Sequence, residues 1–186
     1  MRIISGQYKG RRLISSEDFS IRPTTDRVKE YIFNILQDFP LQKKVTDIFA
    51  GSGSLGLEAL SRGAKEVVFV EKSIQSIAIL QKNIENLKLN SKQFRIENSE
   101  AIKFAQNNTE NFDLFLLDPP FSYSELQKLI NSILSSSYFK KGNLLVLEHE
   151  ITNLIEMENK YYTVIKQKKF GRSLISFIIK KATDAS

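Results

Sequence analysis

The sequence predicts an α/β fold, a three-layer sandwich whose central sheet is mainly parallel with an antiparallel edge. Two observations support this prediction. Short apolar runs alternate along the chain with amphipathic stretches of helical period, as parallel strands and their crossover helices require. The last two runs, on either side of Gly171, lie so close together in sequence that only a hairpin can connect them, and a hairpin is antiparallel.

The composition suits one domain with an ordinary core, because the chain has 186 residues of which 41% are hydrophobic. We assign this domain to residues 1–181, with a basic N-terminal extension over 1–20 and a disordered tail over 182–186. The absence of cysteine excludes disulfides and thiolate chemistry, and with a single histidine we expect no metal. No stretch approaches the roughly eighteen apolar residues of a membrane span, so we expect a cytoplasmic protein.

The chain begins with a basic segment that has the pattern of a β-hairpin. Two short strands are predicted at Arg2–Ser5 and Arg11–Ile14, joined by a loop with two glycines. A helix should follow, capped by Thr24 or Thr25 and with Asp26 in its first turn. Its apolar residues recur at helical spacing: Val28, Tyr31, Ile32, Ile35 and Leu36.

A glycine-rich turn follows the first strand of the sheet. The apolar run Asp47–Ala50 leads into Gly51, Gly53 and Gly56 with the spacing G-x-G-x-x-G, and a second apolar run closes on Glu71. A strand, a glycine turn, a helix and an acid about twenty residues on are typical of folds that hold a nucleoside cofactor. The glycines permit positive φ, the helix N-terminus supplies N–H donors, and Glu71 can accept hydrogen bonds from a ribose diol.

Asp47 bears on which cofactor binds. A carboxylate beside the ligand would repel a pyrophosphate but attract the ammonium and sulfonium groups of S-adenosylmethionine, which favours S-adenosylmethionine over NAD. The alternative is an Asp47 that only caps the turn, a common role of aspartate.

The rest of the chain continues the alternation of helices and strands. The predicted helices are one capped by Ser73 and ending near Asn90, a short one from Asn98, one over Leu126–Leu134 and a short one over Thr152–Met157. The predicted strands are Phe94–Glu97, Phe112–Asp118, Leu144–Leu147, Tyr161–Lys169 and Ser173–Lys180.

A second candidate site follows the central strand at Asp118-Pro119-Pro120-Phe121. The strand beside the first one ends at the topological switch point of such a sheet, so Asp118 should face the same crevice as the glycine turn. Prolines lack N–H donors, so the acid and the Pro119 carbonyl form a pair of acceptors suited to an exocyclic amino group. Phe121 offers a surface on which a base can stack. The alternative is a strand that simply ends at two prolines.

Basic residues gather at both ends of the chain, and the formal net charge of +6 suggests a polyanionic partner. The candidates for nucleic-acid contact are Arg2, Lys9, Arg11, Arg12 and Arg22 near the N-terminus, and Lys168, Lys169 and Arg172 near the C-terminus. Solvated strand faces are the alternative explanation. We expect His149 to be structural or exposed, and we assign no role to Glu148 or Glu150.

Three segments together resemble one family. The sequences from Arg22 to Val28, from Asp47 to Gly63 and from Asp118 to Phe121 are similar to those of the RsmD family of bacterial 16S ribosomal RNA guanine-N2 methyltransferases. The resemblance runs from Arg2 to about Lys180. It implies a class I, Rossmann-like methyltransferase fold, S-adenosylmethionine as methyl donor and a guanine of 16S rRNA as acceptor.

The resemblance also implies roles for individual residues. Cofactor binding is expected of Asp47, Phe49, Gly51, Gly53, Glu71, Lys72, Ser99, Glu100 and Ala101, with Thr24 and Arg27 in the helix cap that closes over the site. The catalytic segment is expected to be Asp118, Pro119, Pro120 and Phe121. Glu100 stands where related methyltransferases commonly have Asp or Asn.

The expected partner is 16S rRNA, within a small ribosomal subunit or its assembly intermediate, and we expect a monomer. Two rival functions remain open. Adenine-N6 DNA methylation and protein glutamine methylation use similar acid-Pro-Pro-aromatic sites, although a chain of 186 residues lacks a separate DNA-recognition domain. A non-catalytic rRNA-binding assembly factor is the alternative outside the enzymes.

Overall fold

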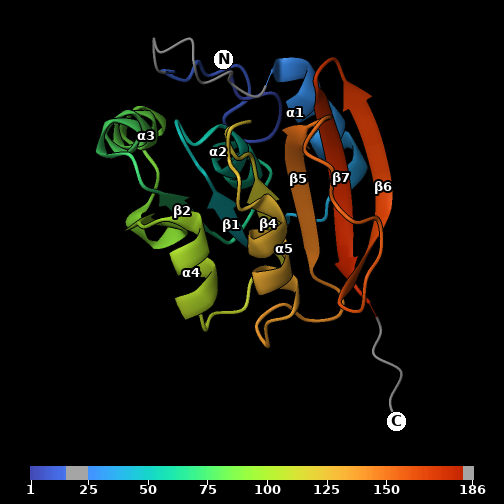
Figure 1. Cartoon of the computed structure of the whole chain (residues 1–186). Coiled ribbons are helices and arrows are strands. Elements are labelled where there is room, and N and C mark those ends of the chain that lie inside the picture. The colour runs from blue at the N-terminus through green and yellow to red at the C-terminus, as the bar shows by residue number, and fades with distance from the viewer. Residues whose placement is uncertain (16–24, 182–186) are drawn as a thin grey trace.

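The computed structural model describes residues 1–15 and 25–181, which form helices around one twisted sheet (Figure 1). Arg22, Thr24 and the tail over 182–186 lie outside the described residues. The helices are α1 (Asp26–Leu36), α2 (Ser54–Ser61), α3 (Ile74–Leu87), α4 (Ala101–Asn107) and α5 (Leu126–Leu134), with a 3-10 turn at Ser91–Gln93. The strands are β1 (Lys44–Ile48), β2 (Glu66–Glu71), β3 (Phe94–Asn98), β4 (Leu114–Leu117), β5 (Leu144–Glu150), β6 (Tyr162–Phe170) and β7 (Ser173–Lys180).

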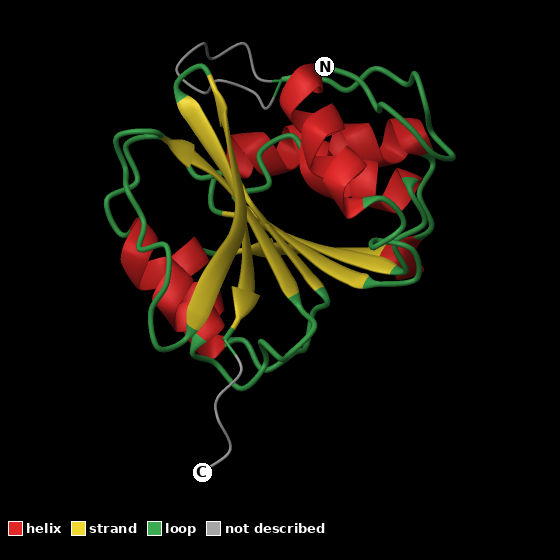
Figure 2. Cartoon of the chain, turned by 90° about the vertical axis from the view of Figure 1, so that its right-hand side faces the viewer, coloured by secondary structure: helices red, strands yellow, loops and turns green. Residues whose placement is uncertain are grey.

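The strand order of the seven-stranded sheet within these ranges is β3-β2-β1-β4-β5-β7-β6. The strands β1 to β5 pair in parallel, and β7 pairs antiparallel with both β5 and β6. Helices cover both faces of the sheet (Figure 2). One core contains apolar residues of α1, α2 and α3, and the other contains those of α4 and α5. The predicted three-layer sandwich with an antiparallel edge is therefore confirmed.

The order of the strands also confirms the predicted switch point. Strands β1, β2 and β3 follow one another toward one edge of the sheet, and β4 then pairs with the other side of β1. The order of the strands therefore reverses between β1 and β4. Immediately after β4, the Asp118 backbone N–H donates to the Ile48 carbonyl at 3.4 Å. The segments that follow β1 and β4 therefore adjoin at the carboxyl edge of the sheet, where ligands bind in folds of this type.

Helix α1 begins where the sequence indicates. Thr25 is its N-cap, and its Oγ1 accepts a hydrogen bond from the Val28 N–H at 3.3 Å. Asp26 occupies the first turn, where a negative charge is favourable.

Two predicted elements are wrong. The N-terminal segment forms a hairpin-like loop with a single bridge between Arg2 and Arg12, rather than two strands. Some backbone groups still bond across the loop, such as the Ile3 N–H to the Arg11 carbonyl at 2.9 Å, but the N–H groups of residues 4, 5 and 14 donate to side chains of α2 and α3. Residues 152–157 form turns and irregular chain, not a helix. The Asn153 carbonyl bonds His149 across that turn at 2.9 Å.

Candidate active site

The glycine turn between β1 and α2 is built from backbone conformations that favour glycine. Gly51 has a φ of 56° and Gly53 a φ of 85°, and Phe49 just before them has a φ of 67°. At Gly56 a Cβ would lie 2.3 Å from the Phe69 ring of β2, so the absence of a side chain allows close packing of helix on strand. The glycine spacing thus has the local consequences that the motif predicts.

Glu71 connects the glycine turn to the N-terminus of α3 through hydrogen bonds. Its carboxylate accepts the Gly51 N–H at 2.9 Å through one oxygen and the Ser73 N–H at 2.8 Å through the other. The Glu71 side chain is partly exposed. A carboxylate has about four lone-pair positions, so two remain for further donors such as ribose hydroxyls.

The end of β3 adjoins the same acid. The Ser99 N–H donates to the Glu71 carbonyl at 3.2 Å, and the Asn98 side chain donates to the carbonyls of Glu71 and Lys72 at 3.1 Å. Ala101 beside them is buried. Glu100 is exposed and pairs with Lys103 at 3.1 Å. Most residues predicted for the cofactor are therefore drawn from neighbouring strand ends.

Asp47 has the capping role that the sequence left as the alternative. Its side chain is 1% exposed, and Oδ2 accepts the Gly56 N–H at 2.8 Å in the first turn of α2. Burial, with a smaller contribution from the charge of Glu71, raises the pKa of Asp47 to about 8. The raised pKa weakens the argument that the charge of Asp47 selects S-adenosylmethionine over NAD, because that argument depends on the ionised form.

The segment after β4 lies against the glycine turn through aromatic contacts. Phe49 and Tyr123 meet edge to face, with ring centroids 4.9 Å apart. The Tyr123 hydroxyl is buried and has no hydrogen-bond partner among the described residues. Burial raises the pKa of Tyr123, so the group stays a donor. An unsatisfied buried donor beside a glycine turn indicates a place for a ligand acceptor.

The acid-Pro-Pro-Phe segment presents the expected acceptors. Asp118 and Phe121 are partly exposed, Pro119 is buried and Pro120 is exposed. The Pro120 carbonyl accepts the Tyr123 N–H at 2.8 Å, which folds the segment into a turn. Pro119 has no N–H to donate, so the polar groups of this segment include its carbonyl and the Asp118 carboxylate.

The turn between β6 and β7 reaches this segment. The Arg172 guanidinium lies over the Phe121 ring, 5.6 Å from its centroid, and also pairs with Glu150 of β5. Sequence reasoning left the position of this turn undecided. The antiparallel pairing of β7 with β5 decides it, because the pairing brings Ser173 opposite Glu150 at the carboxyl end of β5.

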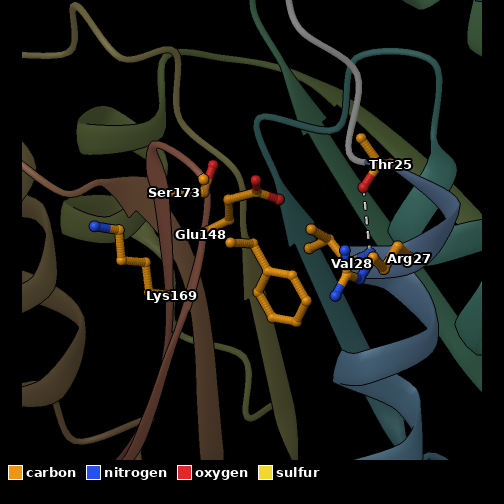
Figure 3. Close-up of a pocket in the computed structure, with 8 residues that line it drawn as sticks. Thr25, Arg27, Val28, Glu148, Lys169 and Ser173 are labelled. Atoms are coloured by element: carbon orange, nitrogen blue, oxygen red, sulfur yellow. Dashed lines mark hydrogen bonds between the residues drawn. The ribbon is translucent and has the colours of Figure 1, made fainter.

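A pocket of about 410 Å³ lies between the start of α1 and the ends of β5, β6 and β7 (Figure 3). It is lined by Thr25, Arg27, Val28, Glu148, Lys169, Phe170, Gly171 and Ser173. Arg27 lies 5.8 Å from the Phe170 ring centroid. Lys169 lines the pocket, but its side chain points away from it. Arg27, predicted for the cofactor, and Lys169, predicted for RNA, therefore line the same pocket from two different elements, α1 and β6.

The N-terminal basic residues are exposed but their backbone is fixed. Arg2, Lys9, Arg11 and Arg12 are exposed, and Arg2 pairs with Asp26 at 3.1 Å. The segment is anchored by buried Glu58 of α2, whose carboxylate accepts the N–H groups of residues 4 and 5 at 2.7 and 3.0 Å.

Other side chains complete this picture. His149 is buried, and its ring nitrogens lie 2.9 Å from the Asn153 carbonyl and 3.0 Å from the Ser176 hydroxyl, so the predicted structural role is confirmed. Burial lowers the pKa of His149. Sequence reasoning missed Tyr123, which follows the acid-Pro-Pro-Phe motif by two residues and has a buried hydroxyl. Its proximity to that motif was the available signal.

No group of three histidine, cysteine or acidic side chains that could hold a metal occurs within residues 1–15 and 25–181. No helix in those ranges is both long and apolar enough to cross a membrane.

Comparisons with known proteins agree on the class of this protein. The family model described as Conserved hypothetical protein 95 matches residues 1–179. A Haemophilus influenzae protein named ribosomal RNA small subunit methyltransferase D is 39% identical over 174 residues, covering 92% of this chain and 89% of the relative. The Escherichia coli K12 protein of the same name is 34% identical over 172 residues, covering 92% and 86%.

A solved structure gives the same result. The structure of yhhF from Escherichia coli, a proposed methyltransferase, has a TM-score of 0.87 at 32% identity and covers 98% of this chain and 99% of its own. Fold, glycine turn and acceptor segment define a class I S-adenosylmethionine-dependent methyltransferase. Within that class, the chain belongs to the RsmD family, the family of the matching model.

Proposed function

We propose that this enzyme transfers the methyl group of S-adenosylmethionine to the exocyclic N2 of a guanine in small-subunit 16S rRNA, and does so within one domain spanning residues 1–181. The observation that supports this most directly is the pair of acceptors at Asp118 and Pro119, which adjoins the glycine turn and is flanked by Phe121. A site that offers only acceptors suits an exocyclic amino group, whose two N–H groups donate hydrogen bonds. The names of the relatives in Haemophilus influenzae and Escherichia coli support rRNA of the small subunit as the substrate.

The proposed chemistry is an in-line displacement in which positioning supplies most of the rate. The nitrogen lone pair forms a bond to the methyl carbon as the carbon–sulfur bond breaks, and S-adenosylhomocysteine leaves. The lone pair of guanine N2 is delocalised into the ring. Hydrogen bonds from its N–H groups to Asp118 and the Pro119 carbonyl localise that pair, and the surplus proton passes to Asp118 or to water.

The residues present fit the cofactor. Glu71 retains acceptor positions for ribose hydroxyls, the turn at Gly51 and Gly53 allows close approach, and the buried Tyr123 hydroxyl awaits an acceptor. When bound there, S-adenosylmethionine would supply an electrophilic methyl group. The proposed cofactor contacts are Asp47, Phe49, Gly51, Gly53, Glu71, Lys72, Ser99, Glu100, Ala101, Thr24 and Arg27. For Asp47 we propose an indirect role, through the α2 terminus that it caps.

For the RNA we propose contacts from the exposed N-terminal arginines and Lys9, and from Lys168, Lys169 and Arg172 around the β6–β7 turn. Arg172 supports the second group because it already covers Phe121, on which the base would stack. An enzyme acting on rRNA works in the cytoplasm, and we propose that it acts there as a monomer on a subunit or an assembly intermediate.

The test is methyl transfer from labelled S-adenosylmethionine to four acceptors in turn: small ribosomal subunits, naked 16S rRNA, duplex DNA and protein. We expect label in rRNA alone, located at a guanine that yields N2-methylguanine on digestion. Label in DNA as N6-methyladenine, or in protein as methylglutamine, would establish a rival enzyme. Absence of label from every acceptor would favour the assembly factor.

Asp118→Ala provides the matching test of the site. Transfer should fall at least about a hundredfold, because a buried hydrogen bond to a charged group and a proton acceptor are lost together. Calorimetry should show S-adenosylmethionine affinity within about threefold of the parent. Asp38→Ala, in an exposed loop at the opposite edge of the sheet, is the control. Retained transfer by Asp118→Ala would remove Asp118 from the mechanism.

A further inference from the structure

Glu148 is a carboxylate to which sequence analysis assigned no role, and the register of β5 on β4 brings it near the segment that begins at Asp118. Leu117 of β4 pairs with Leu147 of β5, so the next residues along these parallel strands are Asp118 and Glu148. Neighbouring strands lie about 4.8 Å apart, and side chains alternate between the faces. Leu117 and Leu147 belong to the core under α4 and α5. Asp118 and Glu148 therefore belong to the opposite face, the side of α1.

The side chain of Glu148 is buried but adjoins open space. It is 7% exposed, and its carboxylate is directed into the 410 Å³ pocket below the start of α1 (Figure 3). Phe170 adds a planar apolar side chain to the lining, and Arg27 and Val28 of α1 lie across from Glu148 (Figure 3). The volume lies in the range of small-ligand sites, and the combination of one flat wall and one directed polar group is suited to a single planar ligand.

The charge of Glu148 restricts what that ligand can be. An ionised carboxylate accepts hydrogen bonds and donates none, so it favours a donor on the ligand group that faces it. The ligand must therefore bring N–H donors. On its Watson–Crick edge guanine presents N1–H next to the N2 amino group, whereas adenine presents a bare N1 acceptor. A carboxylate facing N1 would accept a hydrogen bond from the N1–H of guanine and would be repelled by the N1 lone pair of adenine.

We propose that Glu148 is the specificity-determining residue for the acceptor base: it accepts the N1–H of the guanine whose N2 amino group is held by Asp118. This inference rests on the proposed function. Asp118, just after β4, and Glu148 of β5 then each accept a hydrogen bond from one of two neighbouring donors of the base. The contact to Glu148 explains why an acid-Pro-Pro-aromatic segment shared with adenine methyltransferases acts here on guanine. Recognition of a flipped base through its Watson–Crick edge is a general strategy of base-modifying enzymes.

The experiment replaces the target guanine with 2-aminopurine, which keeps the exocyclic N2 amino group but has no N1–H. The guanine located by the methylation assay is substituted by ligation of a synthetic fragment into 16S rRNA. The parent enzyme and Glu148→Gln are compared by kcat/KM on both RNAs. Affinity for both RNAs is measured as well, from the fluorescence of 2-aminopurine and by competition, so a slow variant still yields a result. Glu66→Gln, at the amino edge of the sheet, is the control.

The parent and Glu66→Gln should prefer guanine over 2-aminopurine by at least about tenfold, as expected for a charged acceptor left without its donor. Glu148→Gln should lose most of that preference, because its amide can turn an N–H toward the bare N1. S-adenosylmethionine affinity, measured by calorimetry, should be unchanged and would show that the variant is folded. An unchanged preference in Glu148→Gln, or a parent enzyme without preference, would overturn the inference. Methylation of guanine by the parent enzyme would still uphold the proposed function.

Discussion

The two basic ends of the chain look alike in sequence but are held in different ways. The N-terminal segment, residues 1–15, is anchored from below by buried polar groups. Glu58 and Lys29 are both 0% exposed, and the Lys29 ammonium donates to the Arg2 carbonyl at 2.5 Å. Asn83 of α3 bonds both the N–H and the carbonyl of Ile14, at 2.8 and 2.9 Å.

The turn between β6 and β7 is held at its surface instead. Arg172 has 71% of its side chain exposed, pairs with Glu150 and covers the Phe121 ring. The difference teaches that a cluster of basic residues does not by itself indicate a movable arm. Gly6, one of the two glycines of the N-terminal loop, is packed so closely that a Cβ there would lie 1.8 Å from the Ser61 carbonyl oxygen. The backbone of the N-terminal segment is held by hydrogen bonds to buried Glu58, whereas the β6–β7 turn contacts the acceptor segment through Arg172.

The largest effect is expected from breaking the anchor of the first region. Glu58 accepts the N–H groups of Ile4 and Ser5 and the Arg62 guanidinium, and lies 4.0 Å from Lys29. Glu58→Gln should lower the free energy of unfolding by about 3–5 kcal/mol, because Lys29 is left buried without its counter-charge. Urea denaturation followed by circular dichroism measures this.

Glu30→Gln is the matched control, since Glu30 is exposed one residue beyond Lys29 and its replacement should cost about 0.5 kcal/mol or less. The double variant Lys29→Met, Glu58→Gln should recover part of the loss. An equal loss in both glutamine variants would show that the anchor contributes little.

Replacing the exposed basic residues of the N-terminal segment should lower RNA affinity without changing the free energy of unfolding. We expect the triple variant Lys9→Ala, Arg11→Ala, Arg12→Ala to reduce the slope of log affinity against log salt by about one unit per lost phosphate contact. S-adenosylmethionine affinity should stay the same. Filter binding of 16S rRNA at several salt concentrations provides the measurement. An unchanged slope would leave the N-terminal segment as scaffold alone.

A smaller effect is expected at the second region. Arg172→Ala should lower kcat/KM for RNA methylation about three- to tenfold, because the stacked guanidinium over Phe121 contributes about 1 kcal/mol to holding a base there. Arg172→Lys keeps the charge but not the plane, so it should restore the salt dependence without restoring kcat/KM. If lysine restored both, the contact would be a simple phosphate contact.

The smallest effect is a dependence of stability on pH. Burial is the main cause that lowers the pKa of Lys29, opposed by the charges of Glu58 and Asp26. The unfolded chain therefore binds more protons than the folded one between the lowered pKa and about 10.4, so this residue makes stability rise with pH across that window. We expect Lys29→Met to lose this rise, which amounts to at most about 1.4 kcal/mol per pH unit. Parallel urea titrations at several pH values would reveal it, and equal slopes for the two proteins would contradict it.

Local patterns of sequence sufficed for the fold and for part of the site. The glycine spacing, the alternation of apolar runs and helical stretches, and the short link around Gly171 determined the layers and the antiparallel edge, because each depends on residues close together in the chain. The switch point beside Asp118 followed from the general order of such sheets. The N-terminal strands and the helix over 152–157 were predicted wrongly, because side chains from distant elements accept backbone N–H groups there, as Glu58 does for residues 4 and 5 and Gln127 does for Glu156.

What the tertiary structure decided concerns groups whose neighbours are far away in sequence. The pKa of the Asp47 carboxyl is raised because the surrounding protein excludes water from it, whereas its sequence position suggested an ordinary charged carboxylate. Arg172 reaches Phe121 only through the pairing of β7 with β5. Glu148 lies beside Asp118 only through the register of β5 on β4, thirty residues apart in the chain. Sequence patterns report local conformation, whereas burial and strand register arise from the assembled sheet, and those two properties decide which side chains can act together.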